Sequence, residues 1–275
     1  MTAPETSIQV APLDLAPIID IPPLEILYTD ESLLAVHKPS GLFVHRTTLD
    51  ARVEDCLLRR VRDFVGAQVH AVHRLDRGTS GIVLFARSSA AAAALSAQFE
   101  AGRVEKRYLA IVRGHPPHEG RIDHALVPLD PDGNRLRHLP AQAAVSDYRV
   151  LATVELPIEV DRYPRTRYAF VELRPLTGRR HQLRRHLKHI AHPVIGDATY
   201  GKGVHNRFIA GYSGVSRLLL ACTAVGFTLP ESGEHVLLEA APAADFRRVA
   251  DALGWQAVIE SAGELERADA DAPAG

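Results

Sequence analysis

The chain has 275 residues, of which 46% are hydrophobic and 24% are charged, and it contains only two cysteines, Cys56 and Cys222. A chain of this size can bury a full hydrophobic core, and two distant cysteines argue against a disulfide framework or a cysteine-ligated metal. No segment approaches the roughly 20 apolar residues of a membrane-spanning helix, and the N-terminus lacks the basic start and apolar run of a signal peptide. We therefore expect a globular protein of the cytoplasm with no membrane association.

The charges are unevenly distributed along the chain. Residues 1–31 carry six acidic residues and no Lys or Arg, and residues 256–275 carry five acidic residues and one arginine. Subtracting both ends from the totals of 33 acidic and 32 basic residues leaves 22 and 31, which is a net charge of +9 for residues 32–255. A basic body favours a phosphate-bearing partner, because each neutralised phosphate releases counterions, but many ordinary enzymes are basic too.

The sequence pattern predicts one domain between two tails. Residues 1–22 hold four prolines without amphipathic periodicity, and residues 256–275 are rich in Ala, Glu and Asp, so we expect both ends to be poorly ordered. Residues 23–255 form the predicted domain. Its predicted strands are 24–28, 33–37, 82–86, 108–113, 145–154, 168–173 and 218–227, and its predicted helices are 89–101, 179–190 and 245–253. Strands and helices do not alternate regularly, which indicates an α+β fold with a largely antiparallel sheet.

Asp76 is the first candidate for chemistry. It lies in the segment His73-Arg74-Leu75-Asp76-Arg77, directly before a Gly/Ser/Thr turn that leads into the predicted strand 82–86. The two neighbouring arginines would favour the ionised carboxylate, which could then act as a nucleophile or base. From these residues alone, an Asp that caps its own turn and pairs with Arg is the simpler interpretation.

The segment 174–189 is strongly basic and contains no acidic residue. Its cations are Arg174, Arg179, Arg180, Arg184, Arg185 and Lys188. Leu183, Leu187 and Ile190 form an apolar stripe that would dock the helix on the core. Six cations without a counter-charge repel one another, so we expect the remaining basic side chains to contact phosphates. The polar loop 130–142 could contact the same partner or be solvated surface.

The sequence indicates neither a metal nor a cofactor. Four histidines fall at i, i+5, i+8 and i+11, which does not converge on one helical face; they are His181, His186, His189 and His192. No dinucleotide-binding glycine motif or P-loop occurs in the chain.

Four separated segments resemble, in order, the conserved blocks of the RluA family of pseudouridine synthases. They are HKPSGLFVH (37–45), HRLDRGTSG (73–81), EKRYLAIVRG (105–114) and LTGRRHQLRRHLKHIAHPVIGDATYG (176–201), and the similarity covers roughly residues 24–240. The resemblance implies a pseudouridine synthase fold, in which helices and loops flank a mixed, mostly antiparallel sheet with a central RNA-binding cleft. It also implies that the chain isomerises uridine in structured RNA without a cofactor.

The resemblance assigns roles to individual residues. Asp76 matches the essential carboxylate that attacks the target uridine, and Arg184 matches the arginine that forms an ion pair with it. Tyr108 matches the tyrosine that packs on the uracil and is proposed to take the C5 proton, and Leu183 the apolar residue that lines the uracil pocket. Arg74 matches the arginine that replaces the flipped-out base. We expect further RNA contacts from His73, Arg77, Arg179, Arg180, Arg185 and Lys188.

Longer strings are similar to one branch of this family, which modifies uridine 65 of tRNA. They span residues 24–50, 148–175 and 182–197, whereas residues 198–201 and the loop 130–142 depart from that branch. Three alternatives remain: the same reaction on large-subunit ribosomal RNA, an inactive RNA-binding module, and a metal-dependent nuclease, against which the lack of an acidic cluster speaks. We expect a monomer without an obligate protein partner and without a separate N-terminal RNA-binding domain.

Overall fold

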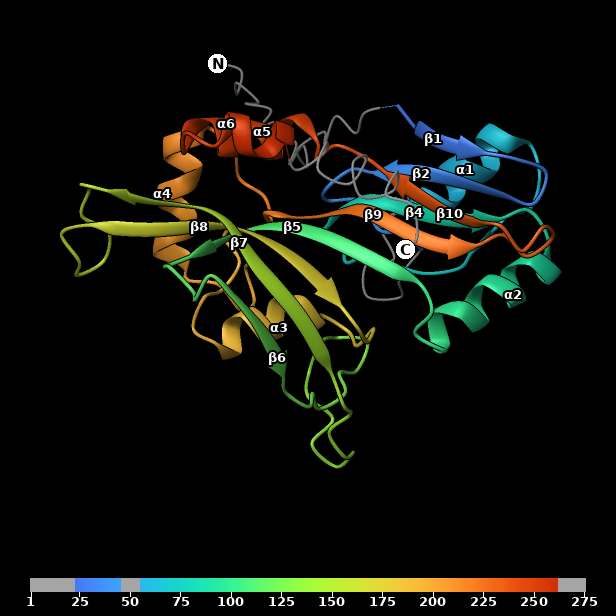
Figure 1. The fold of residues 1–275 in the computed structure, drawn as a ribbon, viewed down its shortest axis with the longest axis horizontal. Coiled ribbons are helices and arrows are strands. Elements are labelled where there is room, and N and C mark those ends of the chain that lie inside the picture. The colour runs from blue at the N-terminus through green and yellow to red at the C-terminus, as the bar shows by residue number, and fades with distance from the viewer. Residues whose placement is uncertain (1–22, 46–54, 262–275) are drawn as a thin grey trace, which may run out of the picture.

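A ten-stranded sheet forms the centre of the computed structural model, which describes residues 23–45 and 55–261 (Figure 1). Its strands are β1 Glu25–Thr29, β2 Leu33–Lys38, β3 His70–Ala71, β4 Ser80–Ala86, β5 Glu105–Arg113, β6 Glu119–Asp123, β7 Val145–Leu156, β8 Thr166–Pro175, β9 Leu220–Thr228 and β10 His235–Glu239. Their order is β1-β2-β4-β9-β5-β8-β7-β6, with β10 also paired to β9 and β3 to β4. Only the β4–β9 pair is parallel among these described strands. The predicted α+β class with a mostly antiparallel sheet is confirmed.

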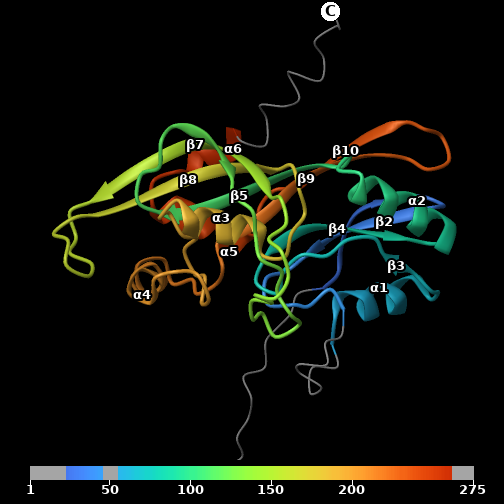
Figure 2. The same cartoon turned by 90° about the horizontal axis from the view of Figure 1, so that it is seen from below.

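Helices cover both faces of the sheet. They are α1 Leu57–Val65, α2 Ser89–Glu100, α3 Gln182–His189, α4 Gly203–Ser213, α5 Ala244–Ala252 and α6 Gln256–Ser261. Helices α1 and α2 pack with β2 and β4 in one core cluster, at the end of the molecule opposite to α4 (Figure 2). Strands β5 and β8 have α3 on one face and α4, α5 and α6 on the other, so α3 lies below them and α5 and α6 above in Figure 1.

The seven predicted strands and three predicted helices are all present, with shifted ends. Helices α1, α4 and α6 and strands β3, β6 and β10 were not predicted. The first six residues of the predicted C-terminal tail form α6, where Ile259 is buried beside Trp255 in the core. Residues 1–22 and 262–275 lie outside the described residues. None of the described helices combines the length and apolarity that crossing a bilayer requires.

Two histidines are built into the folded body in their neutral form. His73 stacks on Phe99, and its Nε2 accepts a hydrogen bond from the backbone N–H of Leu84 at 3.1 Å. His205 is only 3% exposed, and its Nδ1 lies 3.0 Å from the hydroxyl of Tyr168. Burial lowers the pKa of His73 to about 3 and is the main cause that lowers the pKa of His205 to about 4. Both rings are therefore uncharged at neutral pH.

We expect the protein to lose stability as the pH falls from 7 to 5. Both histidines have a pKa in the folded state below the ordinary value of about 6.5, so the unfolded chain binds protons more readily as the pH falls below that value. The free energy of unfolding should fall by roughly 1–2 kcal/mol for each ring over this interval. Urea titrations of the wild type and His205→Gln at both pH values test this, since the variant should show the smaller fall. Equal falls in the two proteins would contradict it.

Candidate active site

The loop between β3 and β4 carries Asp76, and a buried lysine holds the loop in place. Lys38 is fully buried at the end of β2, and its Nζ donates hydrogen bonds to the carbonyl oxygens of Pro39, Leu42 and Arg77 at 2.9, 2.7 and 3.0 Å. The backbone N–H of Gly41 donates to the same Arg77 carbonyl at 2.8 Å. The segment after β2 thus fixes the backbone directly after Asp76.

Gly81 fixes the other end of this loop. Its φ is +114°, and a Cβ at this position would lie 2.0 Å from the backbone carbonyl oxygen of Cys222. Only glycine permits this approach of β4 to β9. The turn before it is closed by a hydrogen bond from the N–H of Thr79 to the carbonyl of Asp76 at 3.1 Å. The carboxylate is therefore presented from a rigid position at the start of a central strand.

Arg184 connects Asp76 to a second carboxylate. Its Nη1 donates to Oδ2 of Asp76 at 3.0 Å. Its Nε and Nη2 donate to the two carboxylate oxygens of Asp197 at 2.7 and 2.9 Å. The side chain of Asp197 is fully buried and that of Arg184 is 10% exposed, whereas the side chain of Asp76 is 22% exposed. One guanidinium from α3 therefore joins two carboxylates that are separated by 121 residues.

Arg184 and Asp197 are both held in their charged form. Burial acts to raise the pKa of Asp197, but the hydrogen bonds and charge of Arg184, with the N–H groups of Tyr200 and Thr199, outweigh burial and lower it. Burial likewise acts to lower the pKa of Arg184, but Asp197 and Asp76 together raise it. Asp197 takes two of the three ionic hydrogen bonds, so within residues 23–45 and 55–261 Asp76 is anchored by one of its oxygens only.

The second oxygen of Asp76 faces His181. Nε2 of His181 lies 3.8 Å from Oδ1 of Asp76, and its Nδ1 lies 3.0 Å from the hydroxyl of Tyr200. His181 adopts a left-handed conformation with φ of 54°, directly before α3. Burial is the main cause that lowers its pKa, so the ring is neutral near pH 7. The spacing leaves this oxygen of Asp76 without a hydrogen bond from His181.

Tyr108 and Leu183 line the same cleft as Asp76, which has a volume of about 690 Å³. Tyr108 projects from β5, and Leu183 projects from α3 and is 7% exposed. Burial is the main cause that raises the pKa of Tyr108, followed by its interaction with Cys222. The phenol is therefore protonated in the free protein at neutral pH. This fits packing against a base directly, whereas accepting a proton would first require loss of the phenolic proton.

The arginines next to Asp76 in the sequence do not pair with it. Arg77 turns away, because its Nε donates to the carbonyl of Gly41 at 3.0 Å and its guanidinium lies 4.9 Å from the ring centre of Phe43. Arg74 is exposed at the cleft. The charge that contacts the carboxylate comes instead from Arg184, which is 108 positions away. His73, also expected to contact RNA, lines the cleft with its Nε2 already bonded to backbone.

Several basic side chains near α3 hold a neighbouring loop. Arg185 is 8% exposed and donates to the carbonyl of Val127 at 2.9 Å. Arg180 donates to the carbonyls of Asp130 and Pro131. Arg180 and Arg185 thus anchor the chain around residues 127–131, and Arg180 also lines the Asp76 cleft. Their expected contacts with RNA phosphates stay a prediction.

The other basic residues of the segment 174–189 either bond to the protein or are exposed. Arg174 pairs with Glu172 at 3.0 Å, so the segment does have a counter-charge outside its own sequence. The Nε of Arg179 donates to the carbonyl of Ala143 at 3.1 Å, although the residue is exposed. Lys188 is exposed on α3. Lys188 and the exposed part of Arg179 remain available to a partner.

Two polar residues that the sequence did not single out for this purpose attach α3 to the sheet. Gln182 is 5% exposed, and its Nε2 donates to the carbonyl of Val145 and to Oγ of Ser146 at 3.0 and 2.9 Å. His186 is fully buried, with Nδ1 3.1 Å from Oγ of Ser146 and Nε2 3.1 Å from the carbonyl of His124. These contacts set the position of α3 and therefore the position of Arg184.

Each of the four histidines between positions 181 and 192 contacts another part of the chain. His181 contacts Tyr200, and His186 contacts Ser146 and His124. The ring of His189 stacks on that of His124 at 3.7 Å, and Nδ1 of His192 lies 2.9 Å from the carbonyl of Arg113. These histidines therefore act through hydrogen bonding and ring packing.

Comparison with known proteins places this site in a family. The family model for RNA pseudouridylate synthase matches residues 32–189. A Pectobacterium carotovorum protein named tRNA pseudouridine synthase C is 44% identical over 86% of this chain, which spans 64% of that relative. A Pasteurella multocida protein of the same name is 47% identical over 78% of this chain and 90% of its own length. The structure of human RNA Pseudouridylate Synthase Domain Containing 4 superposes with a TM-score of 0.66 at 27% identity, over 84% of this chain and 93% of that one.

The chain therefore belongs to the RNA pseudouridylate synthase family, whose members are isomerases. This confirms the resemblance seen in its four sequence blocks and the fold that the resemblance implied. The matched region contains Asp76, Tyr108 and Arg184, while Asp197 lies just beyond it.

We expect Asp197→Asn to lower the turnover number by about tenfold to a hundredfold while RNA binding stays intact. The neutral amide cannot hold both sides of the Arg184 guanidinium, so Arg184 can shift toward Asp76 and displace the carboxylate, and small displacements in an active site carry penalties of this size. Single-turnover rates and dissociation constants measure the two effects. A matched loss of binding, or a turnover number equal to that of the wild type, would contradict this positioning role.

Arg185→Ala should lower the stability of the protein, whereas Lys188→Ala should change the salt dependence of its RNA binding. Removing the buried guanidinium of Arg185 leaves the Val127 carbonyl without its donor, which should lower the free energy of unfolding by about 1–3 kcal/mol. Removing exposed Lys188 should change it by less than about 0.5 kcal/mol and should reduce the slope of log Kd for RNA against log salt concentration by about one. Urea unfolding and salt titrations measure the two quantities. Equal stability losses would contradict the assignment.

Proposed function

We propose that the chain isomerises uridine to pseudouridine in tRNA, most specifically at uridine 65, with Asp76 as its essential carboxylate. The observation that carries this proposal is the Arg184 guanidinium, which anchors one oxygen of Asp76 at 3.0 Å inside a cleft of about 690 Å³. Two curated relatives with 44% and 47% identity are named tRNA pseudouridine synthase C, which supports tRNA as the substrate.

The reaction breaks the bond between N1 of uracil and C1′ of ribose, turns the base in place and joins C5 to C1′. The C5 proton leaves, and N1, which keeps the electron pair of the broken bond, gains a proton. One ionised carboxylate serves this sequence, whether it attacks the ring, attacks C1′ or removes a proton to form a glycal. Hydrolysis of a glycosidic bond typically needs a second carboxylate that activates water. Here the second carboxylate, Asp197, is fully buried and bonded to Arg184, so it cannot serve that purpose.

The cleft also suits the handling of a flipped base. Extruding a nucleotide from a stem costs a few kcal/mol. Arg74 is exposed at the cleft, and its planar guanidinium can stack and donate hydrogen bonds where the base had been. Tyr108 and Leu183 provide an aromatic and an apolar surface for the uracil in the same cleft. These roles form part of the proposal.

The alternatives are separable by substrate and by activity. The names of the relatives favour tRNA over large-subunit ribosomal RNA, although the reaction would be the same. An inactive RNA-binding module would not need a carboxylate that is anchored by one oxygen and open at the other. A place in the cytoplasm belongs to this proposal and stays a prediction.

We expect wild type, but not Asp76→Asn, to release tritium from C5-labelled uridine in a tRNA transcript without added metal or cofactor. The variant should keep its affinity for the transcript, because the amide preserves the shape of the side chain and removes only its charge. Mapping the product by primer extension after carbodiimide treatment should locate it at uridine 65. Release from ribosomal RNA alone would overturn the substrate, and no release from either RNA would overturn the enzyme.

A further inference from the structure

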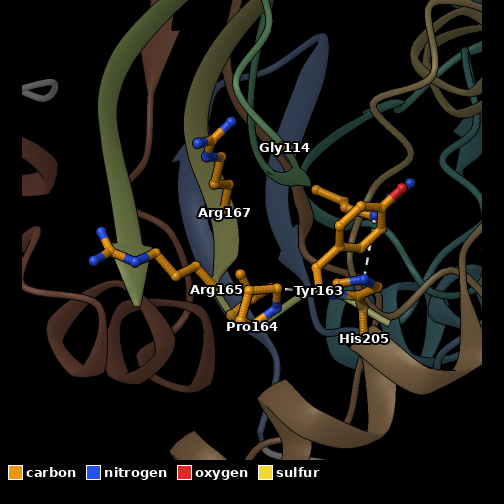
Figure 3. Close-up of a pocket in the computed structure, with 8 residues that line it drawn as sticks. Gly114, Tyr163, Pro164, Arg165, Arg167 and His205 are labelled. Carbon is orange, nitrogen blue, oxygen red and sulfur yellow. Dashed lines mark hydrogen bonds between the residues drawn. The ribbon is translucent and has the colours of Figure 1, made fainter. Parts of the chain in front are cut away.

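A second pocket lies apart from the Asp76 cleft. It has a volume of about 370 Å³, and its lining includes Arg113, Tyr163, Arg165, Arg167 and His205. None of these residues lines the cleft that contains Asp76. Figure 3 shows Tyr163 and His205 on one side of the pocket, while Arg165 and Arg167 extend from the beginning of β8 away from them.

The two sites are related through strand β5. Tyr108 and Arg113 are five positions apart on this strand, which corresponds to about 17 Å along an extended chain. An odd separation places their side chains on opposite faces of the sheet. Arg113 accordingly contacts His205 of α4, whereas the face of Tyr108 carries α3. The pocket is therefore a separate site on the α4 side.

Arg113 is a half-buried cation without a carboxylate partner among the described residues. Its Nε donates to Nε2 of His205 at 3.2 Å. His205 is neutral near pH 7 because its pKa is lowered to about 4, and its ring is fixed by the hydroxyl of Tyr168. This contact orients the guanidinium without neutralising it. In the part of the chain that the structure describes, the two terminal nitrogens of Arg113 have no protein acceptor, and together they match the oxygens of a phosphate.

The edge of the pocket adds further positive charge. Arg165 and Arg167 both pair with Glu155, the first at 2.9 Å, so two cations share one carboxylate. With Arg113, these four residues carry a net charge of +2. Such an excess attracts a polyanion and is screened by salt.

An aromatic ring stands beside these cations. Tyr163 is 42% exposed, and the Arg162 guanidinium lies 5.2 Å from its ring centre. Exposed aromatic rings next to basic side chains are the surfaces on which nucleic acids stack a base or a ribose. The pocket thus combines a group that recognises phosphate with one that recognises a nucleoside.

We propose that this pocket is a second RNA-binding site, in which Arg113 binds a backbone phosphate and Tyr163 packs on the adjoining nucleoside. The inference rests on the proposed function, which supplies an RNA substrate. Because the two sites lie on opposite faces of the sheet, an RNA that occupies both must pass around the domain. We expect a folded tRNA to do so, and a short hairpin that ends at the Asp76 cleft to occupy that cleft alone. The pocket therefore recognises the tertiary shape of the substrate and does not contact the target base.

The test compares two RNAs and three variants. The RNAs are a full-length tRNA transcript and a short hairpin that contains only the stem around the target uridine. The variants are Arg113→Gln, Tyr163→Ala and a control, Arg248→Gln, which removes one exposed cation from α5. Dissociation constants are measured over a range of salt concentrations, and inorganic phosphate is titrated separately.

Arg113→Gln should weaken binding of the full transcript by about tenfold and reduce the slope of log Kd against log salt concentration by about one. Tyr163→Ala, at an exposed position where folding is not at risk, should weaken it by about tenfold with an unchanged slope. Both variants should bind the hairpin like wild type, and Arg248→Gln should match wild type on both RNAs.

Three results would overturn the pocket as an RNA site. They are an unchanged slope for Arg113→Gln, an equal loss on the hairpin, and binding of inorganic phosphate that depends on Arg113 while RNA binding does not. Tritium release by wild type from tRNA together with an unchanged slope would refute the pocket alone. Absence of release would instead refute the proposed function.

Discussion

The bridge that Arg184 forms between Asp76 and Asp197 is the contact on which the site depends. It joins the loop before β4, helix α3 and the segment after α3, which come together only when the central sheet has formed. A charge as buried as Arg184 is tolerable only with good geometry and full pairing. The chain meets this demand by giving it two carboxylates, of which the fully buried one takes two hydrogen bonds and the one at the cleft takes a single hydrogen bond. The result is an Asp76 that is fixed in position and still open to a substrate.

The supports of this bridge are polar contacts on two sides. On one side Lys38 gathers three carbonyl oxygens and holds the backbone after Asp76. On the other side Gln182 and His186 tie α3 to the beginning of β7, since both contact Ser146. Buried polar groups with full hydrogen bonding specify one arrangement more strictly than apolar packing does. The precision of the site therefore comes from these inner polar residues, while its substrate-facing surface is formed by exposed or half-buried ones.

The sequence predicted the fold class, the main strands and the central carboxylate, because these depend on local periodicity and on a run of nine matching residues around Asp76. It did not predict which charge would contact that carboxylate. Arg74 and Arg77 are neighbours of Asp76 in the sequence, but Arg74 is exposed and Arg77 donates to the carbonyl of Gly41. Arg184 reaches Asp76 from 108 positions away. Asp197 stood within the matching segment 176–201, yet its partner could not be inferred from spacing. Long-range pairing is set by the sheet order, which one sequence does not reveal.

The basic residues show a related limit, since charge counted along a sequence does not distinguish a cation that binds a partner from one that binds its own chain. Arg185 is buried against a carbonyl, whereas Lys188, three positions later on the same short helix, is exposed. Conversely, Arg113 lies in a predicted strand and is not among the predicted RNA contacts, although the structure leaves its charge without a carboxylate partner among the described residues. What separates these cases is the acceptor that each guanidinium meets. A carbonyl or carboxylate of the protein satisfies it internally, whereas a neutral imidazole orients it and leaves its charge for a ligand.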